Sequence, residues 1–377
     1  MTPLALSGGP PVRTTLLPYA RQTVDEDDIQ TVEAVLRSDW LTTGPKVEEF
    51  EKAFAAFTGT QEAVAVSNGT AALHAAYAAA GIGPGDEVIV PAMTFAATAN
   101  AAVFLGARPV FADVHPETLL LDPVCVEARI TNATKAIVAV DYAGQPCDYA
   151  ALRTLAQKHH LVLLADACHA LGATYGTAKV GTLADFSTFS FHAVKPLATG
   201  EGGMITTDDI DAAGRMRRLR NHGLTSDHRE RQERGSWLYE MEQVGWNERL
   251  SDIHCALGIS QLKKVPTWTK RRQSIARMYD EAFASLAAVT SLGKRAGLTH
   301  AYHLYVVRLD PKRLSANRKV IFEALRAEGI GVNVHYIPVH LLAYYRRDQG
   351  TSEGLCPVAE AAYQQIVSLP SFAGMTA

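Results

Sequence analysis

Short apolar segments alternate with stretches of helical periodicity along the first 250 residues of the chain. The apolar segments are four to eight residues long and rich in Val, Ile, Leu and Ala, as is typical of strands buried on both faces of a sheet. The expected strands are residues 63–67, 87–90, 109–114, 135–142, 161–166, 185–192 and 203–206, and the helical stretches include residues 69–80, 123–130 and 149–159. Because buried strands that alternate with helices form parallel sheets covered on both faces, the pattern predicts an α/β fold with a mostly parallel sheet.

Two further helices are expected before the first strand. Residues 23–26, with the sequence Thr-Val-Asp-Glu, read as a capping box at the start of one helix, whose apolar positions Ile29, Val32 and Leu36 share a face. This helix ends within residues 40–45, and the second carries apolar side chains at positions 47, 50, 54 and 57.

The pattern changes beyond about residue 250. A long helix is expected over residues 267–286, then a strand over 303–309, a helix over 318–328 and a strand over 331–340. These elements are enough for a second, smaller α/β domain, and a length of 377 residues also favours two domains. We therefore expect a large domain over residues 15–250 and a small C-terminal domain over residues 251–377, with residues 1–14 as an arm packed against the small domain.

Composition and charge exclude several classes of function. The chain has 36 Lys and Arg residues against 39 Asp and Glu residues, a formal net charge of −3, which gives no electrostatic basis for binding nucleic acid or an anionic membrane. The first dozen residues lack the basic start of a signal peptide and contain Pro3, Pro10 and Pro11. Five scattered cysteines match neither a disulfide framework nor a zinc site. We expect a cytoplasmic enzyme without a bound metal.

The first candidate site is the sequence Ser-Asn-Gly-Thr at residues 67–70, between a strand and an Ala-rich helix. The N–H groups of Gly69 and Thr70, the helix dipole and the Thr70 hydroxyl would suit a phosphate. An ordinary helix N-cap is the alternative interpretation. The segment matches neither the P-loop nor the dinucleotide-binding glycine pattern.

The second candidate is Asp166, which follows five apolar residues at the end of a strand. A partly buried carboxylate needs a cationic or hydrogen-bonded partner, and a protonated pyridine nitrogen would be such a partner. A structural salt bridge or a helix cap would also explain it.

The third candidate is Lys195. Along the preceding strand, Ser190 and His192 point to one face while two phenylalanines point to the other. Pro196 disfavours a helical conformation at the lysine, and a glycine-rich loop follows at residues 200–203. A lysine desolvated there would have its pKa lowered, as a Schiff-base nucleophile requires, whereas most lysines are solvated surface charges. Together, the phosphate site, the carboxylate and the lysine meet the demands of pyridoxal 5′-phosphate (PLP).

The sequence resembles PLP enzymes of fold type I, and specifically the DegT/DnrJ/StrS-type sugar-nucleotide aminotransferases. The motifs that carry the resemblance are residues 40–44, 67–73, 166–172, 189–196, 200–203, 247–250 and 256–264. Within the family, residues 140–144, 191–196 and 334–338 are most similar to the PseC subgroup, the UDP-4-amino-4,6-dideoxy-N-acetyl-β-L-altrosamine transaminases of pseudaminic acid synthesis.

The resemblance implies a role for each matching residue at the cofactor ring. Lys195 would bind the cofactor aldehyde and later carry protons, and Asp166 would keep the pyridine nitrogen protonated. His169 would lie near the 3-oxygen of the ring. Phe95 would stack on the ring, unless it is simply a core aromatic.

The resemblance also implies which residues contact the cofactor phosphate and the sugar. Gly69, Thr70 and Ser190 would hold the phosphate, and Asn247 would reach it from the other subunit of a homodimer with shared active sites. The alternative is that Asn247 caps a helix beginning near Ser251. His192, His335 and Tyr336 would face the sugar, and His192 is also a candidate catalytic residue. Each of the three could instead have a structural role.

The implied reaction is transamination from L-glutamate to the 4-keto carbon of a UDP-linked 4-keto-6-deoxy-N-acetylhexose. A related enzyme acting on a dTDP- or GDP-linked 4-ketosugar is the alternative. A PLP-dependent sugar dehydratase would have a histidine in place of Lys195. A regulatory, DNA-binding role is disfavoured by the net charge, and the basic run at residues 215–220 is better explained as a solvated helix face or a site for the UDP phosphates.

Overall fold

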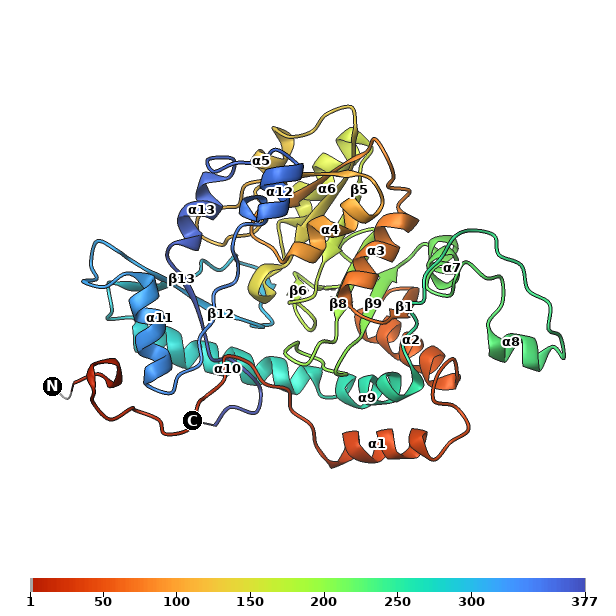
Figure 1. The fold of residues 1–377 in the computed structure, drawn as a ribbon, viewed down its shortest axis with the longest axis horizontal. Coiled ribbons are helices and arrows are strands. Elements are labelled where there is room, and N and C mark those ends of the chain that lie inside the picture. Colours follow the sequence, from red (N-terminus) through yellow and green to blue (C-terminus); the bar gives the residue numbers. More distant parts are fainter. Residues whose placement is uncertain (1–2, 377) are drawn as a thin grey trace.

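The computed structural model describes residues 3–376 and has a seven-stranded sheet at its centre (Figure 1). Its strands are β1 (Glu62–Val66), β2 (Glu87–Pro91), β3 (Arg108–Ala112), β4 (Thr134–Val140), β5 (Val162–Asp166), β8 (Phe186–Ser190) and β9 (Gly203–Thr207). The order across the sheet is β1-β9-β8-β5-β4-β2-β3. Strands β8, β5, β4, β2 and β3 run parallel, whereas β9 is antiparallel to both of its neighbours. The mostly parallel α/β sheet expected from the sequence is confirmed.

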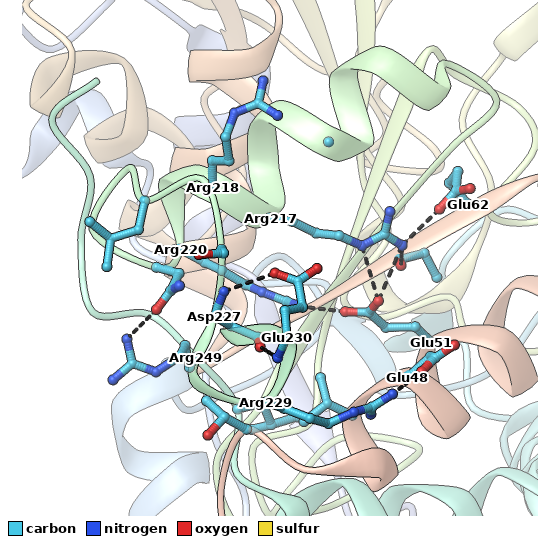
Figure 2. Close-up of a pocket in the computed structure, with 18 of the residues that line it drawn as sticks. Glu48, Glu51, Glu62, Arg217, Arg218, Arg220, Asp227, Arg229, Glu230 and Arg249 are labelled. Atoms are coloured by element: carbon cyan, nitrogen blue, oxygen red, sulfur yellow. Dashed lines mark hydrogen bonds and ion pairs between the residues drawn. The ribbon is translucent and has the colours of Figure 1, made fainter. Parts of the chain in front are cut away.

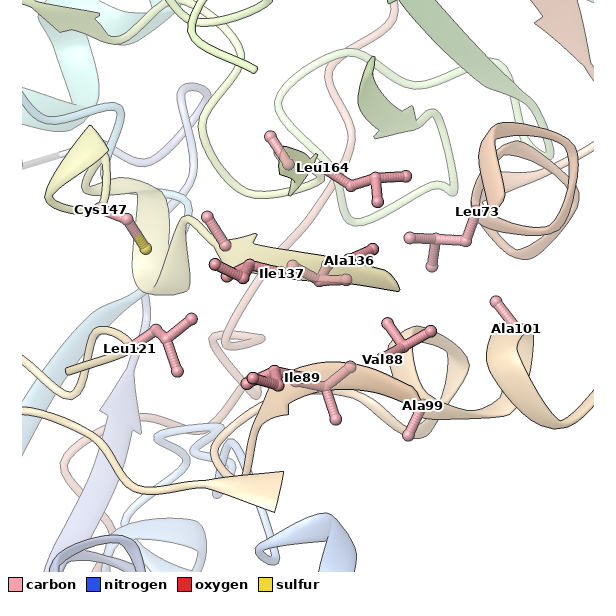
Figure 3. Close-up of a cluster of buried hydrophobic side chains, with 14 of the residues drawn as sticks. Leu73, Val88, Ile89, Ala99, Ala101, Leu121, Ala136, Ile137, Cys147 and Leu164 are labelled. Carbon is pink, nitrogen blue, oxygen red and sulfur yellow. The ribbon is translucent and has the colours of Figure 1, made fainter. Parts of the chain in front are cut away.

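Helices connect the strands and pack on the sheet. They include α3 (Gly69–Ala79), α4 (Ala96–Phe104), α5 (Pro123–Glu127), α6 (Tyr149–His159) and α7 (Ile210–Leu219). Helix α3 contacts β8 and β9, α6 contacts β4 and β5, and α7 contacts β1. Side chains of the central strands, such as Ile89, Ile137 and Leu164, are fully buried in one cluster that also takes Leu73 of α3 (Figure 3). This burial explains why the strands read as continuous apolar runs.

The two N-terminal helices are α1 (Glu26–Leu36) and α2 (Pro45–Thr58). The expected capping box at residues 23–26 is wrong by two positions. Asp25 is the N-cap of α1, its carboxylate accepts from the N–H of Asp28, and the Asp28 carboxylate accepts from the N–H of Asp25 (both 3.2 Å). The aspartates form the same reciprocal pair of bonds that the Thr/Glu box would provide.

A second, three-stranded antiparallel sheet lies in the C-terminal part of the chain. It consists of β10 (Val289–Ser291), β12 (Tyr305–Leu309) and β13 (Ile366–Leu369), in that order. The longer helices of this part are α9 (Asp252–Leu262), α10 (Val265–Phe283) and α11 (Arg318–Ala327). The short elements are β6 (Thr174–Tyr175), β7 (Ala178–Lys179), β11 (Leu298–Thr299), α8 (His228–Glu233), α12 (Ala343–Asp348), α13 (Pro357–Tyr363), η1 (Ala5–Ser7), η2 (Tyr142–Gly144) and η3 (Val339–Leu341).

The strand expected over residues 331–340 is not formed. The N–H of Gly331 donates to the carbonyl of Leu17 (2.7 Å), and Asn333 forms an isolated bridge with Ser368 of β13. The chain then leaves the second sheet, and the N–H of Val339 donates to the carbonyl of Ala92 just beyond β2 (2.9 Å). The alternating sequence pattern of this segment therefore reflects contacts with two different sheets rather than a place in one of them.

The N-terminal arm lies against the end of α11. The Glu328 carboxylate accepts from the N–H groups of Ala5 (2.7 Å) and Val12 (2.9 Å). The division of the chain into domains at residues 250 and 251 stays a prediction. Within residues 3–376, no helix is both long and apolar enough to cross a membrane.

Candidate active site

Asp166 is the last residue of β5 and is buried at the edge where the parallel strands end, with 7% of its surface exposed. It is in register with Val140 of β4 and Thr188 of β8. Its Oδ2 accepts from the hydroxyl of Thr98 in α4 (2.7 Å), and its Oδ1 accepts from the N–H of Cys168 (3.3 Å). Within the described chain it makes no ion pair, so its charge remains available to a cation that binds at this edge.

Lys195 lies in the loop that follows β8, at the same edge of the sheet. The start of this loop is anchored by Phe189 and Phe191, whose buried rings pack 5.0 and 5.6 Å from the ring of Phe54 in α2. The loop then turns, and the N–H of Lys195 donates to the carbonyl of His192 (2.8 Å). The apolar face of the strand thus fixes the position from which the lysine projects.

Burial lowers the pKa of Lys195, and the nearby Cys168 and Asp166 offset only part of this effect. A larger fraction of the amine is therefore neutral near pH 7 than for a solvated lysine. Only the neutral amine attacks a carbonyl carbon, so the site favours Lys195 as a nucleophile.

The N-terminus of α3 and the end of β8 meet at very close range. Asn68 caps the helix by accepting from the N–H of Ala71 (2.8 Å), which leaves the N–H groups of Gly69 and Thr70 without helical partners. A Cβ atom at Gly69 would lie only 2.8 Å from Cβ of Ser190. Only glycine allows this approach, which places the Ser190 hydroxyl beside the free N–H groups.

These features fit PLP. The same hypothetical Cβ at Gly69 would lie 3.5 Å from Sγ of Cys168, so the phosphate cradle borders the turn that starts at Asp166. An anion cradle, a buried carboxylate without a cation and a lysine of lowered pKa thus surround one edge of the sheet. They match the phosphate, the pyridine nitrogen and the aldehyde of the cofactor.

His169 is buried on the other side of this turn. Its Nε2 lies 3.0 Å from the hydroxyl of Tyr336, and its ring packs 4.4 Å from the ring of His303. Burial lowers the pKa of His169 well below its ordinary value, so the imidazole is neutral. The Nδ1 atom is buried without a partner in the described part of the chain, which leaves it available to a bound group.

Tyr142 and His335 bring two distant segments together beside His169. The Tyr142 hydroxyl donates to the backbone carbonyl of His335, and the tyrosine ring lies 6.5 Å from the ring of His169. The His335 imidazole is buried, and its Nδ1 pairs with the hydroxyl of Ser368 (2.8 Å). Burial also lowers the pKa of His335 to about 4, which keeps this ring neutral.

Three of the expected site residues, Phe95, His192 and Asn247, are exposed. Phe95 is the N-cap residue of α4, is 61% exposed and lies 6.1 Å from the ring of Tyr336, so it is not a core aromatic. His192 is also exposed, and its Nδ1 accepts only from the N–H of Val194 (3.4 Å). The structure therefore brings Phe95 to the aromatic group around His169 and leaves His192 outside it.

Asn247 lies in an exposed segment that returns to the body of the molecule. Its neighbour Glu248 accepts, through its backbone carbonyl, from the N–H of Ser67 (2.7 Å), two residues before Gly69. Ser251 is the N-cap of α9, so the alternative interpretation of Asn247 as the cap of this helix is wrong.

Sequence reasoning did not find Thr98, Tyr142 or His303. Thr98 lies one turn beyond Thr94, and the two hydroxyls are 2.7 Å apart in an otherwise apolar segment, which is a weak signal. Tyr142 lies just beyond β4 of the large sheet, but its contact with His335 forms only when the C-terminal part packs on this sheet. His303 belongs to the C-terminal part and reaches the site only through that packing. No local pattern indicates that packing.

Arg217 and Arg220 of the basic run do not form a solvated face. Figure 2 shows them in a pocket of about 630 Å³ with Glu51 of α2, which pairs with both. Arg249 differs, since the partner of its guanidinium is the amide oxygen of Asn221 (2.8 Å). Most of the positive charge of this pocket is therefore already neutralised, which disfavours it as a site for the UDP phosphates.

Asp141 gives a prediction about stability. It is fully buried behind Asp166, its Oδ1 accepts from the N–H of Cys147 (2.9 Å) and the hydroxyl of Tyr149 (3.0 Å), and burial raises its pKa to about 7. The folded state therefore holds this proton more tightly than the unfolded state, so the stability contributed by the protonated carboxyl is lost as pH rises from about 4 to 7. Between pH 5 and pH 8, the free energy of unfolding of the wild type should fall by roughly 3 kcal/mol relative to that of Asp141→Asn. Denaturant unfolding of both proteins at the two pH values checks this, and equal losses would contradict it.

Comparison with known proteins agrees with this geometry. A model of the DegT/DnrJ/EryC1/StrS aminotransferase family matches residues 22–377. The spore coat polysaccharide biosynthesis protein SpsC of Bacillus subtilis is 44% identical over 366 residues, which cover 97% of this chain and 94% of SpsC.

Two solved structures superpose with a TM-score of 0.89. The PLP form of the putative sugar aminotransferase Spr1654 from Streptococcus pneumoniae is 33% identical, and PseC of Helicobacter pylori, an aminotransferase involved in the biosynthesis of pseudoaminic acid, is 34% identical. Each alignment covers 96% of this chain and 95% of the other. The chain therefore belongs to the DegT/DnrJ/EryC1/StrS aminotransferase family, whose members are sugar aminotransferases that use PLP.

Proposed function

We propose that the protein transfers the amino group of L-glutamate to the 4-keto carbon of a UDP-linked 4-keto-6-deoxy-N-acetylhexose. The observation that carries this proposal is the contact between Tyr142 and the His335 carbonyl. It joins the two segments, residues 140–144 and 334–338, whose sequences are most similar to the PseC subgroup, and it does so beside His169. The structural similarity to PseC over 96% of the chain supports the same substrate class.

Different residues at this edge of the sheet would bind different parts of the cofactor. Gly69, Thr70 and Ser190 would hold the phosphate, Asp166 would pair with the pyridine nitrogen, and Lys195 would bind the aldehyde. When bound, PLP supplies an electron sink for the charge left on an amino acid that loses its Cα proton. Asp166 favours this by keeping the ring nitrogen protonated, since a buried carboxylate without another cation strongly prefers a cationic partner.

Lys195 has two tasks in turn. Its neutral amine would hold the aldehyde of the cofactor, and with glutamate bound the amine would be free to act as a base. It then lies at the sheet edge as a base of lowered pKa that removes the Cα proton of glutamate, and as an acid that returns a proton in the reverse direction on the sugar. Neutral His169, held by Tyr336 and His303, would lie near the 3-oxygen of the ring without adding a charge there.

The active sites are completed between two copies of the chain. The segment before Asn247 exposes several large apolar side chains, namely Trp237, Leu238, Tyr239, Met241, Val244 and Trp246, and Trp237 is 84% exposed. The part of the chain around α8 projects away from the body of the molecule (Figure 1). An aromatic, apolar arm of this kind is typical of a subunit interface. A second copy of the chain covers it in a two-fold dimer, and Asn247 at its base reaches the phosphate of the partner.

A substrate panel tests the proposed reaction. With glutamate as donor, the protein should aminate a UDP-linked 4-keto-6-deoxy-N-acetylhexose at least ~10-fold faster than dTDP- or GDP-linked 4-ketosugars, the difference that one or two pocket contacts produce. Amine formation measured by mass spectrometry gives the rates. Faster turnover of a dTDP- or GDP-linked sugar would reject the UDP assignment and leave the family assignment intact.

Subunit mixing tests the shared sites. Lys195→Ala chains and Asn247→Ala chains should each be impaired, and mixed dimers should regain one site that carries both side chains. Activity should therefore rise on subunit exchange by comparison with either parent alone. Mixed dimers that form without any gain in activity would contradict a site completed by the partner.

A further inference from the structure

We infer that His74 and Glu248 form a positioning pair that holds Asn247 in place for contact with the cofactor phosphate of the partner subunit. This inference rests on the proposed function of Asn247 at the cofactor phosphate. His74 belongs to α3, the helix whose N-terminus forms the cradle, and Glu248 directly follows Asn247. The pair therefore joins α3, which begins the cradle of its own subunit, to the base of the exposed arm, which carries Asn247 toward the cradle of the partner subunit.

The contact between the two side chains is direct and largely shielded from water. Nδ1 of His74 lies 3.2 Å from Oε1 of Glu248, and the two side chains are 6% and 18% exposed. Because a carboxylate only accepts hydrogen bonds, the imidazole is the donor. The second polar atom of each partner, Nε2 of His74 and Oε2 of Glu248, is buried without another partner in the described chain. Each side chain thus depends on the other for its hydrogen bond.

The backbone on both sides of Asn247 is also attached to the body of the molecule. Glu248 accepts from the N–H of Ser67 (2.7 Å) and donates to the carbonyl of Arg220 (3.0 Å). Trp246 packs its indole 5.2 Å from the ring of His74, in a T-shaped arrangement. Both neighbours of Asn247 therefore contact His74, which leaves the asparagine between them with little freedom of position.

The rest of the arm is held mainly by its backbone. Residues 240–247 pair with residues 219–225, through bonds such as that from the N–H of Glu242 to the carbonyl of Gly223 (3.1 Å) and that from the N–H of Trp246 to the carbonyl of Leu219 (2.7 Å). The side chains of residues 237–246 are mostly exposed, so the contacts of Trp246 and Glu248 with His74 are the buried side-chain anchor of this segment. Loss of the pair would leave the arm attached by its backbone contacts but would loosen Asn247. The expected consequence is weaker retention of the cofactor rather than loss of the fold.

The test measures the dissociation constant of PLP by titrating the apoprotein, together with the 31P NMR signal of the bound phosphate. Glu248→Ala should weaken PLP binding roughly tenfold or more, the range of one charge-assisted hydrogen bond. Glu248→Gln keeps an acceptor oxygen and should recover most of the affinity. His74→Phe combined with Glu248→Ala should be no weaker than Glu248→Ala alone, because the two residues act as one unit.

A second histidine–glutamate pair provides the matched control. Nε2 of His340 lies 2.8 Å from Oε1 of Glu360, with similar burial, in the C-terminal part and away from the cradle. Glu360→Ala should lower the thermal midpoint and leave PLP affinity and the phosphorus signal unchanged. If Glu248→Ala behaves in the same way as Glu360→Ala, the pair is merely structural and the inference is wrong.

Asn247→Ala separates this inference from the proposal on which it rests. If Asn247→Ala leaves PLP affinity unchanged, the assignment of Asn247 to the phosphate fails. If Asn247→Ala weakens binding while Glu248→Ala does not, that assignment stands and only the positioning role of the pair is rejected.

Discussion

Lys195→Ala should reduce turnover at least ~10⁴-fold, because in the proposed mechanism the same amine binds the aldehyde and moves the proton. The lysine stands alone in these tasks, since the other titratable groups near it, Asp166, Cys168 and neutral His169, are held in hydrogen bonds or lack a mobile proton at neutral pH. Formation of 2-oxoglutarate from glutamate in the presence of the ketosugar gives the rate.

The variant should still fold and still bind PLP through the cradle at Gly69 and Ser190, although without the yellow colour of the lysine-bound form. Lys158→Ala is the control, because Lys158 is an exposed lysine paired with Glu127 on the surface and should leave the rate unchanged. Normal turnover by Lys195→Ala would exclude the aminotransferase mechanism at this site.

Asp166→Asn should lower the rate by about two to three decades. The amide keeps the shape of the side chain and its bond with Thr98, but it removes the negative charge that favours a protonated ring nitrogen. Loss of one charge-assisted hydrogen bond in a dry site costs roughly 2–4 kcal/mol in the transition state. Single-turnover kinetics with glutamate isolate this step from sugar binding.

Asp141→Asn is the matched control for this variant. Asp141 is equally deep, lies at the end of the neighbouring strand, and its N–H donates to the carbonyl of Asp166 (3.1 Å). An asparagine there can keep both bonds to Oδ1, so the rate should change less than ~10-fold. A wild-type rate for Asp166→Asn, or an equal loss in both variants, would show that the ring nitrogen is not bound at Asp166.

The elements that could be predicted from the sequence are those with a strong local pattern. The buried strands read as apolar runs, and Asp166 stands out because a carboxylate directly follows such a run. Lys195 stands out because the side chains before it alternate between phenylalanine and polar residues and a proline follows it. In each case a few neighbouring residues contain the physical reason for the structure.

The parts that could not be predicted depend on contacts between distant segments. Tyr142 reaches His335, and His303 packs on His169, only after the C-terminal part folds against the large sheet. The segment 331–340 has the alternation of a strand but divides its contacts between two sheets. The capping box of α1 lies at Asp25 and Asp28 rather than at residues 23–26, because two boxes of nearly equal quality overlap there and tertiary packing decides between them.

The exposed arm before Asn247 shows that the sequence pattern of one chain does not reveal burial between two chains. Its aromatic side chains have the composition of a buried segment, yet one chain alone leaves them in water. In the proposed dimer a second copy of the chain would cover them, and the proposed role of Asn247 at the cofactor requires that copy.

The most direct test of the central claim is the reaction of the purified, PLP-loaded protein with L-glutamate alone. The account predicts that the visible band of lysine-bound PLP disappears, that the amine form of the cofactor accumulates, and that one equivalent of 2-oxoglutarate is released per active site. Addition of the ketosugar should then restore the original band. Retention of the band, or release of ammonia without 2-oxoglutarate, would contradict the account.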